Sequence, residues 1–302
     1  MVWPKFARFL YDGVRRTRGL EPPGKGLRIL PDDVFLVSFP KSGNTWTRFL
    51  LANLRFPNQP ATWANIDRLV PDTFCTPRVD FDRTPRPRII KSHECFDPRY
   101  SRTIYIVRDP RDVVLSLYHH LRKARTIADD FPIETFVERF LAGETVPHGS
   151  WGQNVMTWLT TSEGNPRFLL LRYEDMLADT ARELARVVGF LQLPVTPEQI
   201  THAIERSSAD RMRKLEKLQA DSNSILRGRA DLPFVRAAAS GGWQKDLPTA
   251  MVEKIEAAWG PLMRHLGYEM AAVGSESSTS STGDEDVLVP EAGPTQNYAE
   301  AG

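Results

Sequence analysis

Four short stretches of the sequence carry side chains that could bind an anion or move a proton. In the first, VSFPKSGNTW, Lys41, Gly43 and Trp46 directly follow a run of apolar strand formers. A loop between a strand and a helix directs backbone N–H groups and the helix dipole at an anion. Gly43 lets the backbone approach a ligand, and Lys41 adds a mobile positive charge. The stretch predicts a phosphate-binding loop.

The first stretch is not a Walker A loop. That pattern places Gly before Lys and uses the next Ser or Thr to bind Mg²⁺, whereas here the lysine precedes a single glycine. Ser42, Asn44 and Thr45 add side-chain donors. A nucleotide bound by protein groups alone, without Mg²⁺, therefore fits better than ATP hydrolysis. Trp46 could stack on a purine or simply pack in the core, and the residues leave both readings open.

The second stretch, RIIKSHECF, places Lys91 and His93 two positions apart on a strand, so they share a face. A lysine can neutralise a transferring group, and a histidine can take a proton from an acceptor hydroxyl. A lone histidine is usually structural, but this one accompanies a lysine at the ligand end of a strand. Cys95 could form a Cys–His nucleophile pair with His93, yet no third group to orient the pair is evident.

The remaining two stretches each contain arginine. In RTIYIVRDPRDVVLSLYHH, Arg108 ends a strand and Ser116 lies two helical turns later, a combination that suits a phosphate. Alone, such an arginine would be read as a surface salt bridge. The fourth stretch, FVRAAASGGWQKD, contributes Arg236. The adjacent His119 and His120 diverge on a helix and make a poor metal pair, so no metal site is expected.

The elements that must position these residues alternate between strand and helix. Apolar runs of strand length cover 34–39, 88–93, 103–107 and 167–173, and helical spacing covers 45–54, 109–121, 151–161, 179–191, 197–206 and 249–266. Asp109 and Pro110 are typical of a helix N-cap and first turn. The alternation predicts an α/β fold, a three-layer arrangement with a central parallel sheet flanked by helices. Ligands of such sheets bind beyond the carboxyl ends of the strands, where the first three stretches fall.

Composition narrows the class of protein. The chain has 302 residues, 41% of them hydrophobic and 25% charged, and a net charge of +1. Because the net charge is close to zero, no nucleic-acid partner is expected, and any anion site must arise from local clustering of basic residues. The two cysteines, Cys75 and Cys95, form no disulfide framework and fit a reducing compartment, so a cytoplasmic location is expected. No apolar run reaches the length of a membrane span.

The two ends of the chain differ from the predicted domain at 33–272. Residues 1–20 predict an amphipathic helix with one apolar and one basic face. This helix could dock on the domain or, through residues 1–18, make a peripheral contact with a membrane surface. Residues 273–302 are rich in serine, glycine and acids and predict a disordered tail.

The first stretch resembles a known family motif. PKSGNTW is similar to the P-K-S-G-T-T-W loop of the cytosolic-type sulfotransferases, which use 3′-phosphoadenosine 5′-phosphosulfate (PAPS) as donor. Further segments resemble the family in order: KSH its K-T-H, the Arg108–Ser116 segment its Y-V-x-R-N-x-K-D-x-x-x-S-x-Y-H, GSWGQNVMTW its G-S-W-x-x-H-V-x-x-W, RYEDM its YEDM, and FVRAAASGGW its F-x-R-K-G-x-x-G-x-W. The resemblance covers residues 33 to about 265.

The resemblance implies a P-loop-like sulfotransferase fold and a PAPS-dependent transferase. The sulfuryl group would move in line to a hydroxyl or amine of a small-molecule, lipid or glycoside acceptor, with PAPS as co-substrate and no metal. The residues it implies as catalytic are His93 as general base, Lys41, Lys91 and Ser116. The residues it implies as cofactor-binding are Lys41, Ser42, Gly43, Asn44, Thr45, Trp46, Arg108, Ser116, Tyr173, Ser207, Arg236, Ala237 and Gly241.

Several positions depart from the family pattern. Ala237 and Ala238 stand where Lys and Gly are usual, so either donor binding is weaker or another basic residue substitutes. Ala209 replaces a phenylalanine that stacks on adenine, and Asn154 replaces a histidine that lies toward the acceptor pocket. The family's dimer motif is matched only in part, by Lys245, Thr249 and Glu253, which leaves the oligomeric state open.

Two alternative functions and the acceptor remain open at this point. A P-loop kinase or NTPase would bind ATP with Mg²⁺, and a non-catalytic protein could keep a relict nucleotide pocket. The acceptor pocket is expected between segments 55–87, 122–150 and 213–235. Their aromatic residues suggest an aromatic or lipid-like acceptor, although core packing explains most of them equally well; they are Trp63, Phe74, Phe81, Phe131, Phe136 and Phe234.

Overall fold

The computed structural model describes residues 22–162 and 164–271. The described residues up to Met270 belong to one compact unit. The predicted helix at 1–20 and the predicted tail at 273–302 lie outside the described residues. The predicted domain at 33–272 lies within them, except for residues 163 and 272. Among the residues described, none of the helices is both long and apolar enough to cross a bilayer.

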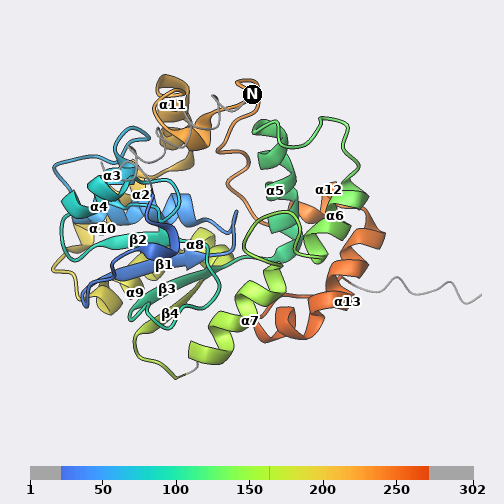
Figure 1. Ribbon diagram of the computed structural model, residues 1–302, viewed down its shortest axis with the longest axis horizontal. Helices are drawn as coiled ribbons and strands as arrows, with labels where there is room; N and C mark the ends of the chain where they lie inside the picture. The colour runs from blue at the N-terminus through green and yellow to red at the C-terminus, as the bar shows by residue number, and fades with distance from the viewer. Residues whose placement is uncertain (1–21, 163, 272–302) are drawn as a thin grey trace, which may run out of the picture. The chain divides into compact units, whose positions relative to one another are not determined.

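The central sheet is parallel, with strand order β2-β1-β3-β4 (Figure 1). Its strands are β1 (Val34–Ser38), β2 (Ile89–Ser92), β3 (Thr103–Val107) and β4 (Phe168–Arg172). The first three are buried at every position, which explains why they read as continuous apolar runs, whereas β4 is half-buried at the edge. The four predicted strands and the α/β fold are confirmed.

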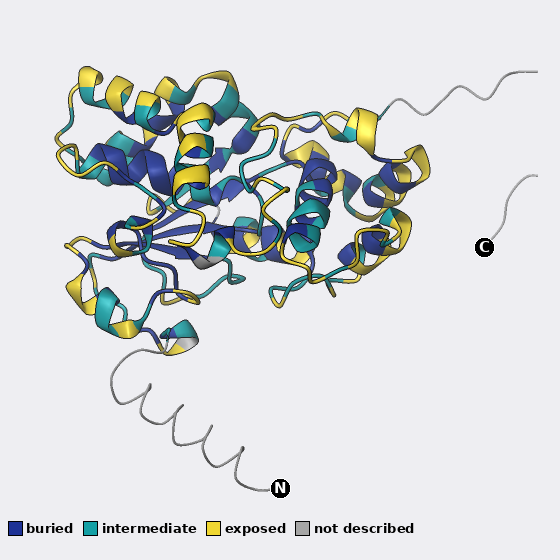
Figure 2. Ribbon diagram, turned by 90° about the horizontal axis from the view of Figure 1, so that it is seen from above, coloured by how far each residue is buried: buried dark blue, intermediate teal, exposed yellow. Residues whose placement is uncertain are grey.

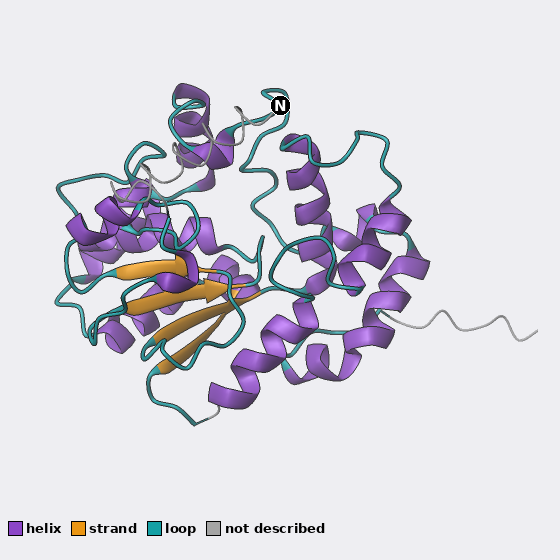
Figure 3. Cartoon of the chain, viewed as in Figure 1, coloured by secondary structure: helices purple, strands orange, loops and turns teal. Residues whose placement is uncertain are grey.

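Helices surround the sheet on both sides (Figure 2). The α-helices are α2 (Asn44–Arg55), α3 (Ile66–Leu69), α4 (Arg78–Arg83), α5 (Pro110–Lys123), α6 (Ile133–Leu141), α7 (Trp151–Ser162), α8 (Tyr173–Ala178), α9 (Thr180–Leu191), α10 (Pro197–Arg206), α11 (Ala209–Leu218), α12 (Trp243–Asp246) and α13 (Thr249–His265), with 3₁₀ turns η1 (Gly24–Gly26) and η2 (Ser224–Leu226). Helix α2 packs on β1 and α10, while α5, α6, α7, α12 and α13 gather beyond the carboxyl ends of the strands (Figure 3).

The start of α5 is fixed as its sequence predicts. Asp109 caps the helix by accepting a hydrogen bond from the backbone N–H of Arg111, and Pro110 occupies the first turn. The Arg111 side chain is itself buried, pairs with Asp109 and Glu256, and lies 3.7 Å from the centre of the Trp243 ring. The helix that carries Ser116, and that directly follows Arg108, is therefore tied to α12 and α13.

Candidate active site

A cavity of about 700 Å³ lies at the carboxyl ends of the strands. Most of the predicted site residues line it, namely Lys41, Gly43, Asn44, Thr45, Trp46, Lys91, His93, Arg108, Ser116, Tyr173, Arg236 and Ala237. Three predicted residues, Ser42, Ser207 and Gly241, do not line the cavity but adjoin residues that do. Segments far apart in the sequence thus converge, as expected for a parallel sheet.

The loop between β1 and α2 is held by its own strand and helix. The Asn44 amide donates hydrogen bonds to the backbone oxygen of Leu36 and to Ser38 Oγ, both at 3.2 Å. Gly43 has a φ of 99°, and a Cβ there would lie 2.5 Å from Cδ2 of Tyr173. Only glycine fits this position, so the close approach predicted for Gly43 is made to an aromatic ring.

Lys41 projects into the cavity without a polar partner. It has a left-handed φ of 71°, and its Nζ lies 4.3 Å from the centre of the Phe234 ring. None of the described residues forms a hydrogen bond or ion pair with its ammonium group. Burial lowers the pKa of Lys41 to about 7, and repulsion from Arg108, Lys91 and Arg236 acts in the same direction. An anion at this point would relieve that repulsion.

Lys91 is paired with a carboxylate that the sequence did not reveal. Its Nζ donates to Asp72 Oδ2 at 2.5 Å, with both side chains buried. Burial by itself raises the pKa of Asp72, but the Lys91 ammonium and neighbouring cations hold it below its usual range. The segment with Asp72 runs beside β2, since Lys91 N donates to Pro71 O and Thr73 N to Lys91 O. No motif marks Asp72, because this pairing is tertiary.

His93 is held as a neutral base. Its Nδ1 lies 2.7 Å from the backbone oxygen of Ser38, and a carbonyl oxygen can only accept, so this bond places the proton on Nδ1 and a lone pair on Nε2. Burial lowers the pKa of His93 well below its usual value, with repulsion from Lys91 adding to the effect. A neutral imidazole with a free lone pair is the form that can accept a proton.

Asn154 supports His93 from behind. It is fully buried; its Nδ2 donates to the backbone oxygen of His93 at 3.0 Å, and its Oδ1 accepts from the hydroxyl of Tyr105 at 2.7 Å. Asn154 does not line the cavity. It therefore acts on the position of His93 rather than on the acceptor directly.

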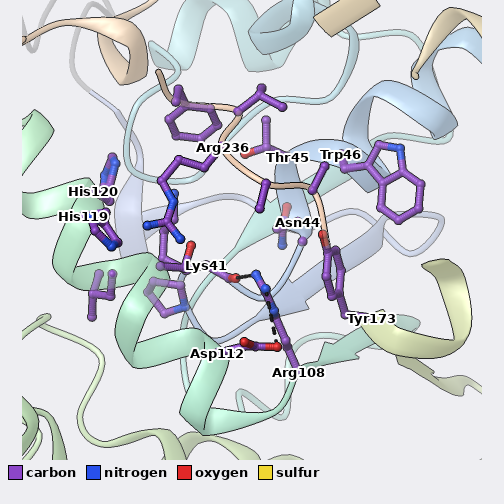
Figure 4. A pocket seen from close by; sticks show the side chains of 18 of the residues that line it. Lys41, Asn44, Thr45, Trp46, Arg108, Asp112, His119, His120, Tyr173 and Arg236 are labelled. Carbon is purple, nitrogen blue, oxygen red and sulfur yellow. Dashed lines mark hydrogen bonds and ion pairs between the residues drawn. The ribbon is translucent and has the colours of Figure 1, made fainter. Parts of the chain in front are cut away.

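Arg108 directly follows β3 and connects two loops (Figure 4). Its guanidinium donates to the backbone oxygens of Lys41 at 3.3 Å and Ala239 at 2.9 Å. The same group lies 4.4 Å from the centre of the Tyr173 ring and 3.8 Å from an oxygen of Asp112. Arg108 is thus fixed with its positive charge at the edge of the cavity.

The loop 233–242 is held by side chains of other elements. Glu216 of α11 accepts from the backbone N–H groups of residues 234 and 235. Arg213, on the same helix, donates to the carbonyl oxygens of residues 235 and 236. At the other end, Asp112 of α5 accepts from Gly241 N at 2.7 Å and from Trp243 N at 3.2 Å. Gly241 therefore anchors the loop instead of lining the cavity.

Arg236 points from this loop into the cavity, toward Lys41 (Figure 4). Within the part of the chain that the structure describes, its guanidinium has no hydrogen bond or ion pair, and burial lowers its pKa. Ala237 and Ala238 follow it with exposed side chains, and Ala238 has a left-handed φ of 50°. The backbone thus keeps a conformation that suits the glycine usual at this position.

An aromatic pair forms another wall. The rings of Trp46 and Tyr173 lie 5.9 Å apart at 79°. Trp46 Nε1 donates to the backbone oxygen of Ser207, and Ser207 Oγ accepts from Asn53, so Ser207 positions Trp46 rather than facing the cavity. Ala209 also lines the cavity. Trp46 is therefore more than core packing, since it has a face on the cavity.

The aromatic residues expected around the acceptor are mostly structural. Of the six, only Phe234 lines the cavity. Trp63, Phe81 and Phe136 are each 1% exposed and belong to the core, and Phe74 is 43% exposed. Of the two explanations that the sequence left open for these aromatics, core packing applies to most of them, because helices such as α4 and α6 bury their aromatics against the domain.

The sequence assigned no ligand-binding role to His119 and His120, which it marked only as a poor metal pair. Both line the cavity from α5, on the side of Lys41 and Arg236 and opposite Trp46 and Tyr173 (Figure 4). Over residues 22–162 and 164–271, the structure contains no cluster of metal-ligating side chains. Cys75 and Cys95 are free thiols.

A parallel sheet with a cationic, aromatic-walled cavity at its carboxyl ends defines a class of α/β proteins suited to anionic nucleotides and group transfer. Comparison with known families gives the particular family. The family model described as "Sulfotransferase domain" matches residues 31–267, so the chain belongs to the sulfotransferase family.

The match to several named relatives covers most of the length of each relative. The chain is 30% identical to mouse sulfotransferase 1 family member D1, over 75% of this chain and 81% of the relative. It is 26% identical to the amine sulfotransferase of Oryctolagus cuniculus, over 76% and 79%. It is 28% identical to cytosolic sulfotransferase 12 of Arabidopsis thaliana, over 74% and 75%.

Solved structures show the same fold. Mouse sulfotransferase SULT7A1 in complex with PAP matches with a TM-score of 0.64 and 23% identity, over 82% of this chain and 89% of the other. Retinol dehydratase in complex with androsterone and PAP matches with a TM-score of 0.63 and 20% identity, over 80% and 83%.

Proposed function

We propose that the protein transfers the sulfuryl group of PAPS to a hydroxyl group, or an amine, of a small-molecule, lipid or glycoside acceptor. The observation that carries the proposal is that one cavity combines two cations without polar partners, Lys41 and Arg236, with a neutral histidine, His93. Similar folds were solved with PAP, the bisphosphate that remains when PAPS loses its sulfuryl group, and one of them also with androsterone.

The residues present fit the two charged ends of such a donor. Lys41 and the loop N–H groups after β1 suit the 5′-phosphosulfate, because they form a cationic loop at a helix N-terminus. Arg108, Ser116 and Arg236 suit the 3′-phosphate. Trp46 and Tyr173 supply aromatic surface for the adenine. PAPS is a substrate here, and it leaves as PAP after each turnover.

The transfer needs one proton acceptor and a group to neutralise the leaving phosphate. The acceptor oxygen forms a bond to sulfur while the bond from sulfur to the bridging phosphate oxygen breaks. His93 takes the hydroxyl proton on Nε2, and Lys41 neutralises the electron pair left on the phosphate. The products are a sulfate ester and PAP. Lys91, its ammonium held by Asp72, suits the sulfuryl oxygens.

Replacing His93 tests this proposal. His93→Ala is expected to reduce turnover by roughly 10² to 10⁴ because the base is lost. Binding of PAP, measured by calorimetry, should stay unchanged, since no donor contact is removed. His202→Ala, which removes an exposed histidine of α10, is the matched control and should change neither quantity. Near-normal turnover by His93→Ala on the true acceptor would contradict its role.

The alternative functions predict different ligands. A kinase or NTPase would be stabilised against heat by ATP with Mg²⁺, whereas the proposed enzyme should be stabilised more by PAP without metal. A non-catalytic binding protein would bind PAP but form no sulfated product. A cytoplasmic location, and a membrane contact through residues 1–18, are further parts of the proposal that cell fractionation would test.

A further inference from the structure

Helix α5 presents a second histidine to the cavity. Asp112, Ser116 and His120 are spaced by four residues, so they lie on one face of the helix, and all three line the cavity. The His120 ring lies 5.7 Å from the ring of Phe234 at 84°, an edge-to-face contact that fixes its orientation. His120 is thus a positioned polar group, not a mobile surface residue.

The imidazole of His120 has no polar partner among the residues the structure describes. Its Nδ1 is buried without a hydrogen bond. Its Nε2 has no hydrogen bond to a described residue and stays accessible from the cavity. A buried or half-buried polar group without a partner is unfavourable. A ligand that forms a hydrogen bond with this imidazole should therefore bind more tightly than one that does not.

His120 lies on the Lys41 side of the cavity, because its ring and Lys41 Nζ both lie beside the Phe234 ring, at 5.7 Å and 4.3 Å from its centre. The side chains that act on it are Lys41, Lys91 and Lys123, and, after burial, their repulsion helps lower its pKa to about 3. His119, one residue earlier, is instead influenced by Arg236 and Arg122. The two histidines therefore divide the cavity, with His119 near the proposed 3′-phosphate site and His120 near the two lysines proposed to act on the sulfuryl group.

The chemistry of this corner narrows the acceptor. A neutral imidazole donates one hydrogen bond and accepts another, which a hydroxyl group matches in either direction. Lys91 is paired with Asp72 and Lys123 with Glu216, so it is Lys41, without a carboxylate partner among the described residues, that disfavours a cationic group here. Apolar side chains also line the cavity, among them Leu121, Val146, Ile225, Pro233 and Phe234, and of these Phe234 contacts the His120 ring. An apolar body with one additional hydroxyl fits these surroundings.

We propose that His120 determines acceptor specificity by hydrogen-bonding a second hydroxyl group of the acceptor, apart from the hydroxyl that receives the sulfuryl group. This inference rests on the proposed sulfotransferase function and names its substrate class: compact apolar molecules that carry two hydroxyl groups. Because the bond exists before and during transfer, it should act mainly through KM and leave kcat little changed.

The test compares matched acceptors. With PAPS as donor, kcat/KM is measured for 2-naphthol and 2,7-dihydroxynaphthalene, and for a monohydroxy steroid and its dihydroxy analogue. After correction for the number of equivalent hydroxyls, the natural protein should prefer the diols by about tenfold, the effect of one well-formed hydrogen bond. His120→Phe, which keeps an aromatic ring, should reduce this preference to about one, and His120→Gln should restore part of it.

His119→Phe is the matched control one position away on α5, and it should leave the diol preference unchanged. An unchanged preference in His120→Phe, or no preference in the natural protein, would overturn the inference. Absence of product from every diol while PAP still binds in calorimetry would also count against it. Failure to bind PAP at all would instead reject the proposed function on which the inference rests.

Discussion

The two loops that carry cations into the cavity are built in different ways. The loop after β1 is fixed from within, since Asn44 bonds back to Leu36 and Ser38 of its own strand and Gly43 turns directly into α2. The loop 233–242 belongs to no neighbouring strand. Side chains of α11 and α5, between 18 and 129 residues away in sequence, hold its backbone.

This difference predicts which of the two loops tolerates amino-acid substitutions better. In the first loop, a larger residue at Gly43 would collide with the Tyr173 ring, so sequence and geometry allow little variation. In the second loop, residues 237–240 are exposed, and two usual residues, a lysine and a glycine, are both alanine. External anchors hold the backbone of the second loop, so its side chains can vary more.

Removing Arg108 should have the largest effect, because this residue joins both loops. Arg108→Ala loses the bonds to Lys41 O and Ala239 O together with a charge proposed for the 3′-phosphate. We expect PAP to bind about 10- to 100-fold more weakly, the range for a hydrogen bond to a charged group. Calorimetry measures this. Arg99→Ala, at an exposed arginine paired with Asp97, is the control. Unchanged affinity in Arg108→Ala would rule out its proposed contact.

The same difference explains how much of the fold the sequence predicted. The strands are short apolar runs and the long helices are amphipathic, so local pattern was sufficient for each of them. Helix α11 was not predicted as a helix. Of its ten residues, only Met212 and Glu216 are buried, and its contribution is polar, through Arg213 and Glu216, which hydrophobic periodicity does not detect.

The residues of the candidate site also fall into two groups, those placed by the local sequence and those placed by tertiary packing. Residues on strand ends and helix starts, such as Lys41, His93 and Arg108, could be predicted because topology alone places them at one edge of the sheet. Asp72 could not, since it reaches Lys91 from an irregular segment that pairs beside β2. His120 was visible in the sequence, but its lack of a polar partner is a property of the packed structure only.

A pH titration should separate the two loops. The pKa of Lys41 is lowered to about 7, so the free protein loses this charge as the pH rises above that value. A bound phosphate favours the charged form, and binding above pH 7 therefore takes up a proton. Between pH 7.5 and 8.5, where a phosphate monoester is fully ionised, PAP affinity should fall by up to about tenfold per unit.

The other groups that face Lys41 should stay constant over this range. Arginine side chains stay charged throughout this range, and His93 and His120 remain neutral because their pKa values are lowered. Lys41→Arg keeps a permanent charge in the first loop and should give a flat profile. A flat profile in the natural protein, or an equal slope in Lys41→Arg, would show that Lys41 does not contribute through its ionisation.

The smallest expected effect comes from restoring the second loop. Ala237→Lys places a cation beside Arg236 at an exposed position, where one additional ion pair contributes little, so PAP should bind about two- to fivefold more tightly. Ala237→Met supplies length without charge and should bind PAP as the natural protein does. Because the new charge is exposed, the gain should disappear in high salt. A gain that persists there, or that Ala237→Met shares, would mean that packing, not charge, is what Ala237 lacks, and that the second loop is as constrained as the first.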